Sequence, residues 1–233
     1  MQQYRDIIFD LYGTLADVKT DESPAAFWER TAEDARLSCG GETLKTAYLS
    51  LCADEVNRLH AAHPEVPEPL IEPELLQVFS RLRSRFGGVD AQSFARLFRK
   101  HSTVFLRPMP HALETLDALR ARGRRVFLLS NAQSCFTNDE LVSLGLAGRF
   151  DGVLLSSDAG VKKPYFGIFE RLLSTCGIDR ETALMVGNDA VADIGGATAA
   201  GLKTAYIHTW SSGARPKTLP PSCTEISDLF DLL

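Results

Sequence analysis

Short apolar runs and helical repeats alternate along the second half of the chain. Apolar runs typical of buried parallel strands cover residues 125–129, 152–155, 183–186 and 204–207. Patterns typical of helices lie near residues 110–122, 137–144, 165–176 and 191–200. Strands that alternate with helices in this way predict right-handed βαβ units and a parallel sheet. The apolar run at residues 5–10 is expected to join this sheet, because alone it has no partner strand.

The stretch from residue 24 to residue 106 has a different pattern, with apolar residues three and four positions apart and almost no strand signal. The clearest helical repeats run over residues 48–59, 75–86 and 94–105. Glycine pairs and a proline-rich stretch separate them, at residues 40–41, 64–73 and 87–88. The pattern predicts about four helices, inserted after the first strand. We therefore expect a core domain of residues 1–16 and 107–233 and a helical domain of residues 17–106.

Composition narrows the classes of protein to which the chain can belong. It is 45% hydrophobic and 24% charged, as in ordinary globular proteins. Its formal net charge of -5 argues against a nucleic-acid partner. The five cysteines include no C-x-x-C pair, which favours reduced thiols over disulfides or a zinc site. Because the sequence has neither a signal-peptide pattern nor a membrane-spanning apolar run, we expect a cytoplasmic monomer or homodimer with no membrane partner.

Polar residues follow four of the predicted strands. In chain order they are Asp10, then Ser130 and Asn131, then Lys162 and Lys163, and finally Asn188, Asp189 and Asp193. Each set alone has an ordinary explanation as a helix cap, a turn or a solvated side chain. The C-terminal ends of neighbouring parallel strands, however, share one edge of a sheet, and ligands bind there. We therefore interpret the four sets together as one site.

The order of these residues resembles motifs I to IV of the haloacid dehalogenase superfamily. The two most specific segments are FDLYGTL at residues 9–15 and VGNDAVADIGGA at residues 186–197. The resemblance covers roughly residues 1–16 and 107–210. The inserted helices resemble the helical cap of the first cap class in that superfamily. The resemblance implies an α/β fold with a Rossmann-like parallel sheet and an inserted helical cap domain.

The resemblance also implies a role for each residue. The first aspartate of the family is the covalent nucleophile and corresponds to Asp10. The motif III lysine corresponds to Lys163 or, as the alternative, to Lys162. The hydroxyl of Ser130 matches the motif II group that orients a substrate oxygen. Further substrate contacts are expected from Thr14, Asn131 and Tyr12.

Magnesium-dependent members of the superfamily hold Mg²⁺ with the motif I aspartate, the backbone carbonyl two residues later and an acidic residue of motif IV. The matching groups here are Asp10, the Tyr12 carbonyl and Asp189. Oxygen ligands of this kind suit Mg²⁺. Asn188 is expected to support the site through water, or to replace Asp189 as the ligand. Asp193 is expected to anchor Lys163 or the start of the following helix.

Tyr12 departs from the phosphatase pattern, which has a second aspartate at this position. That aspartate is the general acid of the family, and such an acid lowers the barrier by roughly 3–5 kcal/mol. A halide leaves without a proton, and the haloacid dehalogenases of the superfamily have a tyrosine here. Tyr12 therefore favours a metal-independent 2-haloacid dehalogenase.

Motif IV favours a phosphatase instead. Dehalogenases have other residues at the positions of Asn188 and Ala190, a tyrosine near Phe169, and a cap arginine that Arg30 and Arg36 match only loosely. The motif carboxylates would repel an anionic substrate unless a cation neutralised them. The preferred prediction is a Mg²⁺-dependent phosphohydrolase of a small phosphorylated metabolite. The alternatives are the dehalogenase and a catalytically weak binding protein of the same fold.

A basic run lies at the end of the predicted helical domain. Its members are Arg81, Arg83, Arg85, Arg96, Arg99, Lys100 and Arg107, against Asp90 alone. Such a run is usually a solvated helix face, and the alternative is a positive surface that steers an anionic substrate. Residues 21–24 and 107–110 flank the insertion and contain helix breakers, so we expect them to be hinges.

Overall fold

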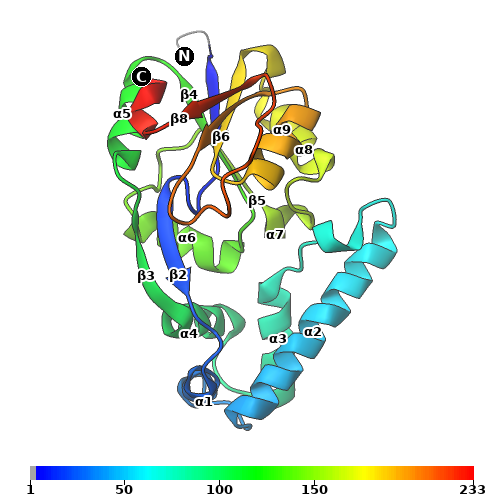
Figure 1. The fold of residues 1–233 in the computed structure, drawn as a ribbon. Helices are drawn as coiled ribbons and strands as arrows, with labels where there is room; N and C mark the ends of the chain where they lie inside the picture. Colours follow the sequence, from blue (N-terminus) through cyan, green and yellow to red (C-terminus); the bar gives the residue numbers. More distant parts are fainter. Residues whose placement is uncertain (1–3) are drawn as a thin grey trace.

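A six-stranded parallel sheet forms the centre of the computed structural model, which describes residues 4–233 (Figure 1). Its strands are β1 (Asp6–Phe9), β4 (Arg125–Ser130), β5 (Gly152–Leu155), β6 (Ala183–Gly187), β7 (Lys203–Ile207) and β8 (Cys223–Ile226). They are ordered β5-β4-β1-β6-β7-β8, and every neighbouring pair is parallel. The predicted α/β fold class is confirmed. The prediction missed β8, because this four-residue edge strand has little apolar pattern.

Helices cover both faces of the sheet, because alternate strand residues point to opposite sides. Ile7 and Phe9 of β1 pack towards α5 (Ala112–Ala121), α6 (Ser134–Ser143) and the short helix η4 (Leu229–Leu232). Ile8 points the other way, towards α8 (Phe166–Cys176) and α9 (Gly196–Ala199). Both layers are almost wholly buried. This packing explains why the central strands are apolar without interruption.

The helix predicted at residues 191–200 is divided in the structure. A π-helical turn, η3 (Ala190–Gly195), comes first and is followed by α9. The remaining short helices are α7 (Ser156–Ala159) after β5 and η2 (Arg180–Thr182) before β6. The wide turn η3 lies at the C-terminal edge of the sheet. Single π-helical turns often mark functional sites.

Four α-helices form the inserted block, as predicted, and lie below the sheet in Figure 1. They are α1 (Ala25–Asp34), α2 (Gly41–Ala62), α3 (Leu75–Phe86) and α4 (Ala91–Ser102), with the short helix η1 (Glu68–Leu70) between α2 and α3. Their shared core is rich in aromatic rings in edge-to-face and tilted contacts: Phe27, Trp28, Tyr48, Phe79, Phe94 and Phe98. The helices therefore have an apolar core of their own.

A two-stranded antiparallel ribbon joins the helical block to the sheet. It consists of β2 (Ala16–Thr20) and β3 (Thr103–Pro108). The sequence analysis was wrong here, because it predicted no strand at residues 16–20, found almost no strand signal from residue 24 to residue 106 and counted Phe105 in a helical repeat. The helix α4 ends at Ser102, and the β-branched and aromatic residues that follow pair with β2 instead.

The helical block also contacts the sheet part of the molecule on two sides. On one side, the Phe136 ring of α6 stacks on Phe98 of α4, with ring centroids 6.2 Å apart. On the other side, the Lys162 backbone N–H donates to the Leu70 carbonyl at 2.9 Å, beside a bridge between Ile71 and Val161. Lys162, which makes the second contact, directly precedes Lys163. The helical block therefore touches the loop that carries Lys163.

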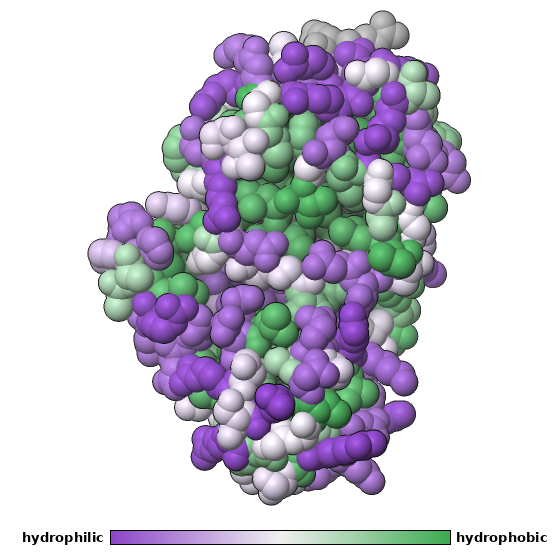
Figure 2. Space-filling view, turned by 180° about the vertical axis from the view of Figure 1, so that it is seen from behind, coloured by the Kyte–Doolittle hydropathy of each residue, from purple (hydrophilic) through white to green (hydrophobic). Residues whose placement is uncertain are grey.

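The surface carries both hydrophilic and hydrophobic residues. Seen from behind in Figure 2, hydrophilic residues cover most of the upper end of the molecule, the lower end mixes hydrophilic and hydrophobic residues, and hydrophobic residues gather in a hollow in the upper half. Across residues 4–233, no helix combines the length and the apolar character that a membrane span requires.

Candidate active site

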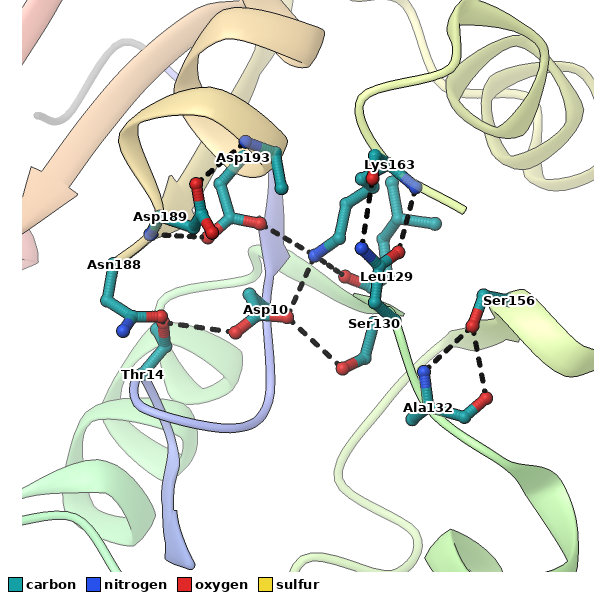
Figure 3. A network of polar contacts seen from close by, with 12 residues as sticks. Asp10, Thr14, Leu129, Ser130, Ala132, Ser156, Lys163, Asn188, Asp189 and Asp193 are labelled. Carbon is teal, nitrogen blue, oxygen red and sulfur yellow. Dashed lines mark hydrogen bonds and ion pairs between the residues drawn. The ribbon is translucent and has the colours of Figure 1, made fainter. Parts of the chain in front are cut away.

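Asp10 lies at the C-terminal edge of the sheet, directly after β1 (Figure 3). Its backbone N–H donates to the Val186 carbonyl of β6 at 3.0 Å, which continues the pairing of the two strands. Ser130 ends β4 on one side of Asp10, and Asn188 follows β6 on the other. The sheet thus brings three of the predicted strand-end residues together at one place.

Lys163, and not Lys162, is the lysine beside Asp10. Its Nζ lies 2.8 Å from Asp10 Oδ1, 2.7 Å from Asp193 Oδ1 and 2.7 Å from the Leu129 carbonyl. The Lys163 residue is only 2% exposed. Burial alone lowers its pKa, but the two carboxylates outweigh burial and raise the pKa above its ordinary value. Lys163 is therefore a permanent cation in the site.

Asp193 is the second carboxylate that holds Lys163. Its Oδ2 accepts a hydrogen bond from the Asp189 backbone N–H at 2.9 Å. Burial raises the pKa of Asp193 to about 7, against the opposing effect of Lys163. A Cβ atom on Gly187 would lie 2.3 Å from Asp193 Oδ2, so only glycine leaves room for the carboxylate. This close approach explains the glycine at the end of β6.

The two oxygens of Asp10 have different surroundings. Oδ1 accepts from Lys163 and also from the Ser130 hydroxyl, at 3.1 Å. Oδ2 has a single long contact, 3.4 Å from the Thr14 hydroxyl, which also lies 3.3 Å from Asn188 Oδ1. Asp10 lines a cavity of about 210 Å³. One carboxylate oxygen of Asp10 is thus firmly held, and the other is left for a ligand.

Asn131 fastens the lysine loop. Its Nδ2 donates to the Lys163 carbonyl at 3.0 Å, and its Oδ1 accepts from the Lys163 N–H at 2.8 Å. Both ends of the amide are therefore used on the backbone of one residue, Lys163. Asn131 lines the cavity, but the substrate contact that the sequence analysis predicted for it competes with these two bonds.

Asp189 lines the same cavity and caps η3. Its Oδ1 accepts from the backbone N–H groups of Val191 and Ala192, both at 2.8 Å. Among residues 4–233, no group of three or more His, Cys, Asp or Glu side chains can hold a metal ion. The predicted set of two carboxylates and a carbonyl fits Mg²⁺ nevertheless, because this ion binds through one or two carboxylates and fills its remaining positions with water or substrate phosphate.

The hydroxyl of Tyr12 is bonded to α6 and not to Asp10. It donates to Glu140 Oε2 and lies 3.1 Å from the Thr137 hydroxyl. Burial and the Glu140 carboxylate raise the pKa of Tyr12 well above its ordinary value. Glu140 Oε1 in turn accepts from Arg99 of α4. The Tyr12 side chain thus links the turn after Asp10 to the helical block.

Several residues of the site were missed by the sequence analysis. Ser211, Ser212 and Gly213 line the cavity from the segment after β7, which the sequence analysis did not assign to the site. The rule that strand ends meet at one edge also applies to β7, so it could have found them. No sequence signal pairs Glu140 with Tyr12, because 128 residues separate them.

The other candidates lie away from the cavity. Four members of the basic run are paired with carboxylates: Arg81 with Asp54, Arg96 with Asp139, Arg99 with Glu140, and Arg107 with Asp17. Arg30 pairs with Asp34, and Phe169 is buried in the core of the sheet. Neither these residues nor Arg36 line the cavity beside Asp10.

Known proteins have sequences similar to parts of this chain. A glyceraldehyde 3-phosphate phosphatase from Methanothermobacter thermautotrophicus is 36% identical over 111 residues, which is 47% of this chain and 49% of that protein. A phosphoglycolate phosphatase from Aquifex aeolicus is 34% identical over 61% of this chain and 68% of that protein. This chain spans about half the length of the curated relatives that it matches first.

Solved structures of two activities have the same fold. A HAD phosphatase from Thermococcus onnurineus has a TM-score of 0.63 at 19% identity, covering 98% of this chain and 95% of that one. A 2-haloacid dehalogenase from Pseudomonas syringae has a TM-score of 0.58 at 20% identity, covering 98% and 96%. The family model of haloacid dehalogenase-like hydrolases matches residues 4–201. Together with the four strand ends around Asp10, this match shows that the chain belongs to the haloacid dehalogenase-like hydrolase family.

Proposed function

We propose that the protein is a Mg²⁺-dependent phosphohydrolase that acts on a small phosphorylated metabolite through a covalent intermediate on Asp10. One observation carries the proposal. The Asp10 carboxylate is held through Oδ1 by Lys163 and Ser130, while its Oδ2 remains available at a polar cavity. The relatives named as phosphatases of glyceraldehyde 3-phosphate and phosphoglycolate support this reaction and a small substrate.

In the proposed reaction, Asp10 Oδ2 attacks phosphorus, and the bond from phosphorus to the leaving oxygen breaks. Water then attacks the aspartyl phosphate and releases inorganic phosphate, which restores the carboxylate. Lys163 offsets the negative charge that gathers on the phosphoryl oxygens and keeps Asp10 ionised. The Ser130 hydroxyl holds the other carboxylate oxygen and limits rotation of the nucleophile.

Mg²⁺ would be held by Asp10, the Tyr12 carbonyl and Asp189, with Asn188 and Asp193 in support. The ion supplies positive charge that neutralises the phosphate and the carboxylates. These donors are all oxygen atoms, as Mg²⁺ prefers. Lys163 by itself leaves an excess of negative charge among Asp10, Asp189 and Asp193, so an anionic substrate needs a further cation.

The position of Tyr12 bears on the choice of substrate. Its hydroxyl proton is donated to Glu140, so we expect no proton from this side chain for the leaving group. The departing alkoxide must take its proton from water. Substrates with weakly basic leaving groups should therefore react fastest.

We further propose that residues 17–106 act as a cap over a core of residues 1–16 and 107–233. The chain enters the helical block through β2 and returns to the core through β3, so the ribbon of these two strands suits a hinge. The helical block contacts α6 at Phe136 and the lysine loop at Val161, so it touches two segments that follow strands of the site. A cap in this place would exclude water from the aspartyl intermediate.

A second candidate function rests on Tyr12. A haloacid dehalogenase has a tyrosine at this position and needs no general acid, since a halide leaves unprotonated. In that reaction Asp10 would displace halide from the carbon of a 2-haloacid, and water would then hydrolyse the ester. The reaction needs no metal, which separates it from the phosphohydrolase.

The deciding experiment measures product release from p-nitrophenyl phosphate and from 2-chloropropionate. Each substrate is tested with Mg²⁺ and with EDTA, using the wild-type protein and Asp10→Asn. We expect phosphate release that requires Mg²⁺ and is lost in Asp10→Asn. Halide release that persists in EDTA would establish the dehalogenase. Absence of both activities would favour a binding protein and overturn the proposal.

A further inference from the structure

The segment between β7 and β8 forms one wall of the cavity beside Asp10. Ser211, Ser212 and Gly213 line the cavity together with residues of the strand ends. Within residues 4–233, none of the lining residues belongs to the helices α1–α4. This wall is therefore the part of the cavity that does not come from the family motifs.

Two hydrogen bonds attach this segment to the chain just after the nucleophile. The Thr209 hydroxyl donates to the Gly13 carbonyl at 2.9 Å. The Trp210 indole N–H donates to Asp17 Oδ1, also at 2.9 Å, and the buried Asp17 accepts from Arg107 at 2.8 Å as well. The wall is thus held on the same stretch of chain that begins with Asp10.

The segment packs without spare room against the motif I turn. Gly13 has a φ of 89°, which favours glycine. A Cβ atom on Gly13 would lie 2.3 Å from Asn188 Nδ2 and 2.6 Å from the Ser211 hydroxyl. If residues 209–213 shifted, they would therefore press against Asn188 or against the turn at Gly13.

A line of polar contacts runs from this wall to the nucleophile. Asn188 Nδ2 donates to the Ser212 hydroxyl at 3.3 Å. At the other end of the same amide, Asn188 Oδ1 lies 3.3 Å from the Thr14 hydroxyl. Thr14 is also 3.4 Å from Asp10 Oδ2, the oxygen that Lys163 does not hold (Figure 3). Ser212 itself is fixed by the Thr209 N–H at 3.0 Å.

These contacts determine which way the Asn188 amide faces. Because Ser212 accepts from Nδ2, the amide oxygen faces the Thr14 hydroxyl and can accept its proton. A reversed amide would donate to the Thr14 oxygen instead, and the Thr14 proton would then turn to the free oxygen of Asp10. A carboxylate oxygen that accepts such a hydrogen bond is a weaker nucleophile, since its lone pair is partly engaged.

We propose that Ser212 is a positioning residue of the active site, which orients the Asn188 amide and thereby keeps Asp10 Oδ2 free for attack. This role rests on the proposed phosphohydrolase function. It deepens that function by adding the segment of residues 209–213 to the reaction machinery.

The test compares Ser212→Ala with Ser212→Thr, which keeps the hydroxyl. Ser222→Ala is the matched control, because Ser222 lies in the same connection but does not line the cavity. Kinetics with p-nitrophenyl phosphate and Mg²⁺ give kcat and KM. In addition, ¹H–¹⁵N spectra follow the side-chain amide of Asn188, assigned through its loss in Asn188→Asp.

We expect Ser212→Ala to lower kcat by about tenfold to a hundredfold while KM changes little, because a misplaced reacting group slows the chemical step. Ser212→Thr should recover most of kcat. The Asn188 side-chain signals should shift in Ser212→Ala and stay in place in Ser222→Ala.

An unchanged kcat in Ser212→Ala would overturn the positioning role. Equal losses in the alanine and threonine variants, with a lowered unfolding midpoint in both, would also overturn it, since they indicate a purely structural residue. If the wild-type protein releases no phosphate, the proposed function fails. The side-chain amide spectra then test the positioning role on their own. Unshifted Asn188 signals in Ser212→Ala would show that Ser212 does not orient the amide.

Discussion

Two buried charge networks begin at the same short turn. They differ in whether both oxygens of the central carboxylate have a close hydrogen-bond partner. The first is the Lys163 network, made of Asp10, Lys163 and Asp193. The second is the Arg99 network, made of Tyr12, Glu140 and Arg99. In the Arg99 network both Glu140 oxygens are taken, one by Tyr12 and one by Arg99. In the Lys163 network, Asp10 Oδ2 has only a 3.4 Å contact with Thr14.

The comparison teaches that burial of charge alone does not identify a catalytic site. Both networks are buried and hydrogen-bonded, and both contain a cation between or beside carboxylates. Only the Lys163 network leaves an oxygen unengaged at the polar cavity. The Arg99 network instead connects the turn after Asp10 with α6 and α4, and we expect it to hold the helical block in place.

The largest effect is expected from Lys163→Met. In the proposed reaction this change removes the cation that stabilises the transition state, so kcat for p-nitrophenyl phosphate should fall by about a thousandfold. Lys162→Met is the matched control, since Lys162 does not line the cavity, and it should retain most of the activity. Similar rates for the two variants would remove the catalytic distinction between the networks.

Glu140→Gln should mainly reduce stability. The side chains of Glu140 and Arg99 are 7% and 17% exposed, and breaking such a buried ion pair costs about 3 kcal/mol of unfolding free energy. Urea unfolding measures the change. The control is Asp139→Asn in the pair with Arg96, where both side chains are more than half exposed, and its unfolding midpoint should not move. Equal midpoints for both variants would contradict the structural role of the Arg99 network.

Tyr12→Phe tests whether the Tyr12 hydroxyl anchors the helical block or takes part in catalysis. The ring remains, but one hydrogen bond to the buried Glu140 is lost, at a cost of about 1 kcal/mol of stability. Because the hydroxyl does not contact Asp10, kcat for an alkyl phosphate should stay within about threefold. A loss of about a hundredfold in kcat, with little change in stability, would instead make Tyr12 the general acid.

The smallest effect on activity is expected from changing Asp6, a further buried carboxylate at the start of β1, which serves as a reference. Burial alone raises its pKa, but hydrogen bonds from Arg125 and Arg5 outweigh burial and hold the pKa below its ordinary value. A lowered pKa adds stability above the pKa of the unfolded chain, near 4, and this stability is lost as the pH falls through the folded pKa.

The corresponding measurement is the unfolding free energy of wild type and Asp6→Asn from pH 7 to pH 3. Their difference should be constant above about pH 5 and should shrink as the pH falls further. A difference that grows towards acid would show that the carboxyl is protonated more easily in the folded protein, against the assigned sign.

The sequence by itself determined the elements that depend on local pattern. Uninterrupted apolar runs located five strands of the sheet, and repeats three and four apart located the helix α3 to the residue and the middle of the longer helix α2. The order of Asp10, Ser130, Lys163 and Asp193 at successive strand ends also followed from the sequence, because parallel strands place their C-terminal ends on one edge.

Tertiary structure alone decided where the side chains at these positions point. Tyr12 meets Glu140 from 128 residues away, Lys163 is chosen over Lys162 by the direction of one loop, and Ser212 reaches Asn188 from beyond β7. The short strands β2, β3 and β8 also escaped the sequence analysis, because partner strands stabilise them more than their own pattern does. Contacts between residues far apart in the chain leave no periodic signal, since they arise only when the chain packs.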